Sequence, residues 1–242
     1  MSDCQTNPNF SILLPTRNRV DKLTDAIHSL YSKAKYKEKV EFCIKIDDDD
    51  TETINYIKNL SKFINIKYDI SPREGGYADL YKFFNKCCEI STGNWLFLFN
   101  DDGRMLTEHW DKILLEINPF EVKGWKGTKD ICLLSPSIKH KNASFIYPIL
   151  KRSTYEILGH FSNGFYSDDY IYKVMSPLDA AIYVEKVLVS EISETMIDQV
   201  YEEGRHAYKT DCYKLINDAL KNIETDIYKL ISHMQNQTQD SY

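Results

Sequence analysis

The stretch GNWLFLFNDDGR, residues 93–104, sets the architecture that the sequence predicts. The five apolar residues from Trp95 to Phe99 have the length and aromatic content of a buried strand. This run ends at Asn100, and Asp101 and Asp102 follow it. Two adjacent carboxylates at the rim of a sheet form a site for a hard cation such as Mg²⁺ or Mn²⁺, which prefers oxygen ligands. On these residues alone, an acidic turn between a strand and a helix is the alternative.

Three further apolar runs precede this strand in the chain. They lie at residues 10–14, where Pro15 stops the strand, and at 40–46 and 64–70. Segments with apolar residues three and four apart lie between the runs, at 20–36, 51–63 and 77–88, and these predict helices. Alternating strands and helices predict an α/β fold with a parallel, doubly wound sheet.

Polar loops follow three of these strands, and parallel strands place such loops at one edge of the sheet, where ligands bind. The first loop, PTRNR at 15–19, offers cations and hydrogen-bond donors. The loops DDDD at 47–50 and NDDGR at 100–104 offer acids. This pattern of charges predicts a site for a phosphate-bearing ligand and a divalent metal ion.

The second half of the chain is less regular. We expect strands at 131–135 and 144–150, and an edge strand at 187–191. We expect helices at 111–117, 153–158, 170–175, 177–186 and from 195 to about 235. Ser153 is a plausible N-cap of its helix and Gly159 a plausible C′ residue.

Composition excludes several classes of protein. The 242 residues carry a net charge of −6, which argues against nonspecific binding to nucleic acid or anionic membrane. The six cysteines show no CxxC spacing, and this favours a reduced, cytoplasmic protein. No apolar run approaches 18 residues, so we expect neither a signal peptide nor a membrane span, although peripheral membrane association stays open.

Four motifs together resemble the family-2-like, nucleotide-sugar-dependent glycosyltransferases of the GT-A fold. They are SILLPTRNR at 11–19, IKIDDDDTET at 44–53, the long segment 75–102 ending in FLFNDD, and FYSDDYI at 165–171. The resemblance implies a Rossmann-like nucleotide-binding sheet flanked by helices, with acceptor-side strands. The resemblance spans roughly residues 10–175, and we expect a GT-A domain at 1–194, with a nucleotide-sugar half at 10–117 and an acceptor half at 118–194. The remaining residues, 195–242, do not resemble the family, and their pattern predicts a helical C-terminal extension.

The same resemblance implies a metal-dependent, inverting transfer of a sugar from a nucleoside diphosphate sugar to a hydroxyl. The acceptor would be a glycan, a lipid or a protein, and the cofactor Mn²⁺ or Mg²⁺. A bound cation neutralises the leaving diphosphate as a Lewis acid, which fits the acidic loops. The C-terminal helices would serve as an acceptor-side cover, a homodimer contact or a membrane-surface foot.

The resemblance implies a role for each residue at a position that matches the family's motifs. Pro15, Thr16 and Arg17 would line the nucleotide. Asp47, with Asp49 as its competitor, would bind the base or ribose, and Arg73 would flank the base or the diphosphate. Asp101 and Asp102 would form the metal-binding motif, with Asp102 the favoured direct ligand. His206 would be a third metal ligand, and a surface histidine is the alternative interpretation.

An inverting transfer also needs a carboxylate that deprotonates the attacking hydroxyl. Asp168 and Asp169 are the candidates, because adjacent carboxylates before a helix can raise one another's pKa. We favour Asp168, and the alternative is a pair of N-capping residues. The aromatic residues Trp125, Phe161, Phe165 and Tyr166 could stack against an acceptor sugar or pack in the core.

Two other functions remain open at this point. A sugar nucleotidyltransferase would carry a Gly-rich, basic loop after the first strand, and PTRNR contains no glycine. A non-catalytic nucleotide-sugar-binding module fits the two departures from the family pattern. These are Asn100 in place of an acid and Phe84 in place of an arginine.

Overall fold

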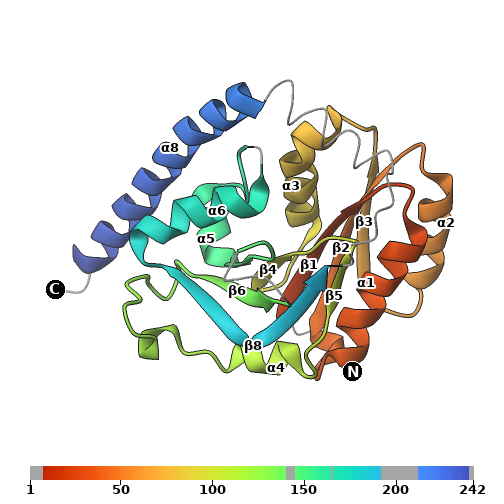
Figure 1. Cartoon of the computed structure of the whole chain (residues 1–242), viewed down its shortest axis with the longest axis horizontal. Coiled ribbons are helices and arrows are strands. Elements are labelled where there is room, and N and C mark those ends of the chain that lie inside the picture. The colour runs from red at the N-terminus through yellow and green to blue at the C-terminus, as the bar shows by residue number, and fades with distance from the viewer. Residues whose placement is uncertain (1–7, 140–144, 165, 192–211, 240–242) are drawn as a thin grey trace, which may run out of the picture.

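The computed structural model describes residues 8–139, 145–164, 166–191 and 212–239. In these residues eight strands form one sheet in the order β3-β2-β1-β4-β7-β6-β8-β5, with helices on both of its faces (Figure 1). The predicted α/β class is therefore confirmed. No helix in the described part of the chain combines the length and the apolar character needed to cross a bilayer.

The first half of the chain follows the predicted alternation. Its strands are β1 (Phe10–Thr16), β2 (Val40–Asp47), β3 (Ile66–Ser71) and β4 (Trp95–Leu98), and β3, β2, β1 and β4 pair in parallel. The helices between them are α1 (Val20–Lys33), α2 (Thr51–Leu60) and α3 (Leu80–Ile90), with the short 3₁₀ helices η1 (Lys37–Lys39) and η2 (Gly76–Asp79).

We expected Pro15 to end β1 because proline lacks an N–H group, but the strand continues to Thr16. The strand pairs with β2 as far as Thr16, whereas its pairing with β4 ends at Leu13. Proline is tolerated where a strand lacks a ladder partner on one side. The longer β1 carries Thr16 to the edge of the sheet, next to the loop after β4.

The second half adds β5 (Gly103–Met105), β6 (Leu133–Ile138), β7 (Ile149–Lys151) and β8 (Ala181–Glu191). Its helices are α4 (Trp110–Leu115), α5 (Arg152–Leu158), α6 (Ser167–Met175) and α8 (Cys212–Gln239), with the 3₁₀ helices η3 (Pro119–Glu121) and η4 (Ser176–Leu178). Strand β7 runs antiparallel to β4, and the same sheet continues from one half of the chain into the other.

The prediction of a helix at 177–186 is wrong. Only η4 is helical there, and β8 occupies most of the segment. Ile182 and Val184 are buried, and the side chains between and before them are less so, which is the period of a strand. The expected edge strand at 187–191 is the end of β8, which lies between β6 and β5 and is therefore not an edge.

The caps of α5 agree only in part with expectation. The helix begins at Arg152, so Ser153 is not its N-cap; the Ser153 hydroxyl donates instead to the carbonyl of Asp130. Gly159 has a φ of 83° and ends the helix in the left-handed conformation, as predicted.

Two apolar clusters of described residues cover the two faces of the sheet. Ile12 and Leu14 of β1 pack in the cluster formed with α1, α2 and α4, whereas Leu13 belongs to the cluster formed with α3, α5, α6 and α8. Successive strand residues point to opposite faces, and burial on both sides explains why the parallel strands are continuously apolar. Helix α8 packs against α5 and α6 (Figure 1).

Candidate functional site

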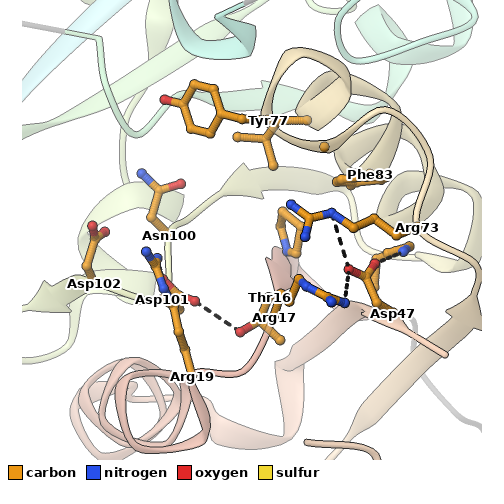
Figure 2. A pocket seen from close by; sticks show the side chains of 14 residues that line it. Thr16, Arg17, Arg19, Asp47, Arg73, Tyr77, Phe83, Asn100, Asp101 and Asp102 are labelled. Atoms are coloured by element: carbon orange, nitrogen blue, oxygen red, sulfur yellow. Dashed lines mark hydrogen bonds and ion pairs between the residues drawn. The ribbon is translucent and has the colours of Figure 1, made fainter. Parts of the chain in front are cut away.

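A first pocket lies at the carboxyl ends of β1, β2 and β4, the place that the sequence predicts. The loops after β1, β3 and β4 contribute side chains to it, as do the end of β2, η2 and α3 (Figure 2). Among the predicted ligand-binding residues, the lining includes Pro15, Thr16, Arg17, Asp47, Arg73, Asp101 and Asp102. Asp49 does not line the pocket, and its side chain is 62% exposed.

Positive charge gathers at one end of this pocket, around the buried carboxylate of Asp47. Arg17 Nη1 lies 2.9 Å from Asp47 Oδ2, Arg73 Nε lies 3.8 Å from the same oxygen, and Lys45 Nζ donates to Oδ1 (Figure 2). Arg17 also binds Asp49 with both terminal nitrogens. Three cationic side chains thus gather around Asp47, and such groups suit an anionic ligand.

Lys45 is a pocket residue that our sequence analysis missed. Its side chain is 2% exposed, its ammonium group lies 4.5 Å from the centre of the Phe83 ring, and it donates to the Ser71 carbonyl at 3.3 Å. The signal was present in the sequence, because Lys45 is a charged residue within the apolar run VEFCIKI. Lysine is rarely buried unless it is paired, so this position indicated a functional or structural partner.

The acidic end of the pocket contains two neighbouring carboxylates, Asp101 and Asp102, which have different partners. Asp101 accepts from Thr16 Oγ1 at 3.0 Å and forms an ion pair with Arg19 Nη1 at 3.0 Å. Asp102 makes no hydrogen bond or ion pair with the described residues. Burial, together with the charge of Asp101, raises the pKa of Asp102. Asp102 is thus the carboxylate that a cation would stabilise most.

Gly103 allows this turn to pack closely. A Cβ atom at this position would lie 2.8 Å from the Phe99 ring and 3.0 Å from the Tyr147 hydroxyl. Such distances force a neighbouring aromatic ring to move. The glycine after the two acids therefore lets the loop lie directly on the aromatic core of the sheet.

The carboxylates at Asp102 and Asp101 fit a divalent cation that is held partly by these side chains and partly by a substrate. The described residues contain no group of three His, Cys, Asp or Glu side chains able to hold a metal. Mg²⁺ is commonly held by one or two carboxylates together with substrate phosphates, and Asp102 with Asp101 supplies that number. His206, the predicted third ligand, lies outside the described residues.

A second pocket adjoins the first and shares Tyr77, Leu80, Asn100 and Asp102 with it. Asp168 lines this second pocket, in the first turn of α6. Burial raises the pKa of Asp168 to about 6, although backbone N–H groups of the same turn oppose the shift. The charge of Asp169, which we expected to cause the shift, contributes less than burial.

Asp169 points elsewhere. It forms an ion pair with Lys173 at 2.6 Å, is half exposed and does not line the second pocket. The two residues are not N-caps, because Tyr166 holds that position without a side-chain hydrogen bond. Asp168 is therefore the carboxylate of this pair that lines the second pocket.

The aromatic residues that we considered for stacking against an acceptor sugar also differ in position. Tyr166 lines the second pocket, whereas Phe161 is fully buried and packs in the core. Trp125 packs on Phe120, with ring centres 4.9 Å apart, and lines neither pocket. Phe165 lies outside the described residues. Glu191 and Ser167, which sequence reasoning missed, also line the second pocket.

Several solved glycosyltransferases share this fold. The mannosyltransferase PcManGT from Pyrobaculum calidifontis, solved with GDP-Man and Mn²⁺, has a TM-score of 0.62 and 12% identity over 98% of this chain and 81% of its own. S. aureus TarS has a TM-score of 0.59 and 14% identity over 76% of this chain. A TarS fragment solved with UDP-GlcNAc has a TM-score of 0.57 and 15% identity, over 82% of this chain and 65% of its own.

The match covers only 36% of the longer TarS chain, so this chain spans about a third of that protein. No curated protein matches the chain by sequence. The family model described as glycosyl transferase family 2 matches residues 11–171, which is well over half of the chain and contains every motif that carried the resemblance. Together with the eight-stranded sheet and the acidic turn at its edge, this match shows that the chain belongs to glycosyl transferase family 2.

Proposed function

We propose that this chain transfers a sugar from a nucleoside diphosphate sugar to an acceptor hydroxyl. One observation carries the proposal: the two pockets meet at Asp102, and the carboxylate of Asp168 faces the second of them. A donor in the first pocket would thus present its sugar to an acceptor in the second. The solved relatives support this class of donor, since one was solved with GDP-Man and another with UDP-GlcNAc.

The charges along the first pocket fit such a donor. Arg17, Lys45 and Arg73 lie around Asp47 at one end, where base, ribose and diphosphate oxygens could accept their hydrogen bonds. Tyr77 and Phe83 add aromatic surface to the lining. Residues 10–117 would form the donor half of the enzyme and residues 118–194 the acceptor half.

The reaction follows from these positions. Asp168 accepts the proton of the acceptor hydroxyl, and the acceptor oxygen attacks the anomeric carbon of the donor sugar. The bond between that carbon and the diphosphate oxygen breaks, and the nucleoside diphosphate leaves with the electron pair. Attack from the second pocket, on the face opposite the diphosphate, would invert the anomeric configuration.

Asp102 would hold a Mn²⁺ or Mg²⁺ ion, with Asp101 beside it. Such an ion, when bound, neutralises the charge that develops on the leaving diphosphate. Arg19 and Thr16 hold Asp101 in place at 3.0 Å each, so the acidic turn is preformed. Preformed groups lose little conformational entropy when a ligand binds.

Hydrolysis of UDP-GlcNAc, UDP-Glc and GDP-Man, with and without Mn²⁺, tests the proposal. We expect one donor to be hydrolysed slowly with metal, and EDTA or Asp102→Ala to abolish the reaction. Binding of a donor without any hydrolysis or transfer would favour a non-catalytic binding module. Absence of donor binding in a thermal-shift assay would contradict the proposal altogether.

A further inference from the structure

We propose that Arg104 is a positioning residue that fixes the direction of the Asp102 carboxylate. Arg104 lines neither of the two pockets, and its side chain holds the backbone of the acidic turn from behind. The role assigned to Arg104 rests on the proposed function, because it concerns the metal ion that Asp102 would hold. It adds a residue outside both pockets on which the affinity of that metal site depends.

The side chain of Asp102 has no hydrogen bond or ion pair with another residue in the described part of the chain. The carboxylate of its neighbour Asp101 is held instead by Thr16 and Arg19, at 3.0 Å each. The backbone must therefore set the direction in which the Asp102 side chain leaves the chain. That direction depends on the two planar peptide groups that flank the residue, one shared with Asp101 and the other with Gly103.

Hydrogen bonds hold both of these peptide groups. The Gly103 N–H donates to the Asn100 carbonyl at 3.0 Å, which closes a turn around the two acids. On the other peptide group, Arg104 Nη1 donates to the Asp101 carbonyl at 2.8 Å. The same nitrogen donates to the Gly103 carbonyl at 2.7 Å, since a guanidinium nitrogen of this kind carries two N–H bonds. The backbone of Asp102 is thus fixed on both sides.

Arg104 is itself held from two directions. It lies on β5 opposite Ser190 of β8, and its Nη2 atom lies 3.2 Å from Asp25 Oδ2 on α1. The Arg104 side chain is only 12% exposed. An arginine that is already ordered by its neighbours loses little further conformational entropy when it binds the two carbonyls. Arg104 therefore ties the acidic turn to α1.

This arrangement has a consequence for metal binding. Groups that orient a metal ligand without touching the metal commonly change metal affinity by about 10- to 100-fold when they are removed. Without Arg104, the peptide group between Asp101 and Asp102 could rotate, and the carboxylate would lose that freedom on binding an ion. Removing Arg104 also removes a positive charge, which by itself would strengthen the binding of a cation. The two effects have opposite signs, so weaker binding would identify orientation as the role of Arg104.

Arg104→Met tests this role with two measurements that do not depend on activity. Hydrogen exchange of the segment containing the Gly103 amide is followed by mass spectrometry in the protein without ligands. The Kd for Mn²⁺ is measured by EPR in the presence of saturating UDP or GDP. We expect faster exchange in this segment and a Kd for Mn²⁺ that rises about tenfold or more. The Kd of the nucleoside diphosphate without metal should stay unchanged, because the cations around Asp47 remain in place.

Arg152→Met is the matched control. Arg152 begins α5 and lines neither pocket, and its guanidinium group donates to the Gly93 carbonyl and to the Ser91 hydroxyl. Gly93 precedes β4, whereas the acidic turn follows it, so this arginine holds the opposite end of the same strand. Both variants should lose stability in urea. Only Arg104→Met should change the exchange of the acidic turn and the affinity for Mn²⁺.

The outcomes separate the role of Arg104 from the proposed function. Unchanged or tighter Mn²⁺ binding in Arg104→Met, or unchanged exchange of the Gly103 segment, would overturn the role of Arg104 and leave the metal site standing. Equal effects in Arg152→Met would also overturn it, because they would show a general loss of stability. A wild-type protein that binds the nucleoside diphosphate but no Mn²⁺ would contradict the metal site itself, and the role of Arg104 with it.

Discussion

Arg19 Nη1 lies 3.0 Å from Asp101 Oδ1, and this ion pair joins the loop after β1 to the acidic turn after β4. Both side chains are largely buried, with exposures of 15% and 7%. The pair neutralises Asp101, whereas its neighbour Asp102 has no such partner in the part of the chain that the structure describes. Two residues that look equivalent in the sequence therefore have different properties in the fold.

The first prediction separates these two carboxylates. Asp102→Asn should lower the metal-dependent rate at least about 100-fold and leave stability equal or higher, because it removes a buried charge. Asp101→Asn should destabilise the fold by about 3 kcal/mol, because it breaks the largely buried ion pair with Arg19. Donor hydrolysis and urea unfolding measure the two effects. Equal losses of stability in both variants would contradict the distinction.

A pH profile tests Asp168, whose pKa burial raises to about 6. A general base must be deprotonated, so kcat/KM should rise with pH and level off above about 6. Asp168→Asn should remove both the activity and this ionisation. Asp169→Asn should keep the profile, since Asp169 faces Lys173.

The same raised pKa also affects stability. Because the folded protein binds the Asp168 proton more tightly than the unfolded chain, stability should fall as the pH rises from about 4 to about 6. Asp168→Asn should therefore stabilise the protein by up to about 3 kcal/mol at pH 7 and change little below pH 4. Urea unfolding at the two pH values measures the difference, and equal effects at both would contradict the raised pKa.

Lys45 should contribute to donor binding. Lys45→Met removes one of the three cations around Asp47, and we expect the donor Kd to rise about tenfold, as for the loss of one charged hydrogen bond. Calorimetric titration with the nucleoside diphosphate measures this change. Lys86→Met, which removes an exposed lysine paired with Glu89, is the control and should bind normally.

Asp226 should hold α8 on the body of the protein. Its buried carboxylate accepts from the Tyr170 hydroxyl at 2.5 Å and lies 2.7 Å from His160 Nε2. Asp226→Ala should lower stability by about 3 kcal/mol and increase hydrogen exchange throughout α8, because these partners lose their acceptor. Retained protection of α8 would show that apolar packing alone holds the helix.

The stability that Asp226 contributes should depend on pH with the opposite sign to the contribution of Asp168. Burial would raise the pKa of Asp226, but hydrogen bonds from His160 and Tyr170 outweigh burial and lower it. The stabilisation should be present above the unfolded pKa near 4 and be lost as the pH falls through the lower folded value. Unfolding of the wild-type protein and of Asp226→Ala should therefore converge in acid.

Much of the architecture follows from local sequence patterns. The apolar runs around Ile12, Ile44 and Phe97 predict buried strands, and the polar loops after them predict a ligand site at one edge. The predicted strands are confirmed, because strand period and burial are properties of short segments. The prediction of a helix at 177–186 failed because the apolar and charged residues of this segment suit either a helix or a strand. Pairing with β6 decides for the strand.

The sequence by itself determined the parallel half of the sheet, the loops that form the site and the residue types available there. Only the tertiary structure shows how the surroundings of the two members of each acidic pair differ. Asp101 forms an ion pair with Arg19 and accepts a hydrogen bond from Thr16, and both partners are more than 80 positions away in the chain. Asp169 is turned toward Lys173. Charge states of neighbouring carboxylates depend on partners and on burial, and both arise only when distant segments pack together.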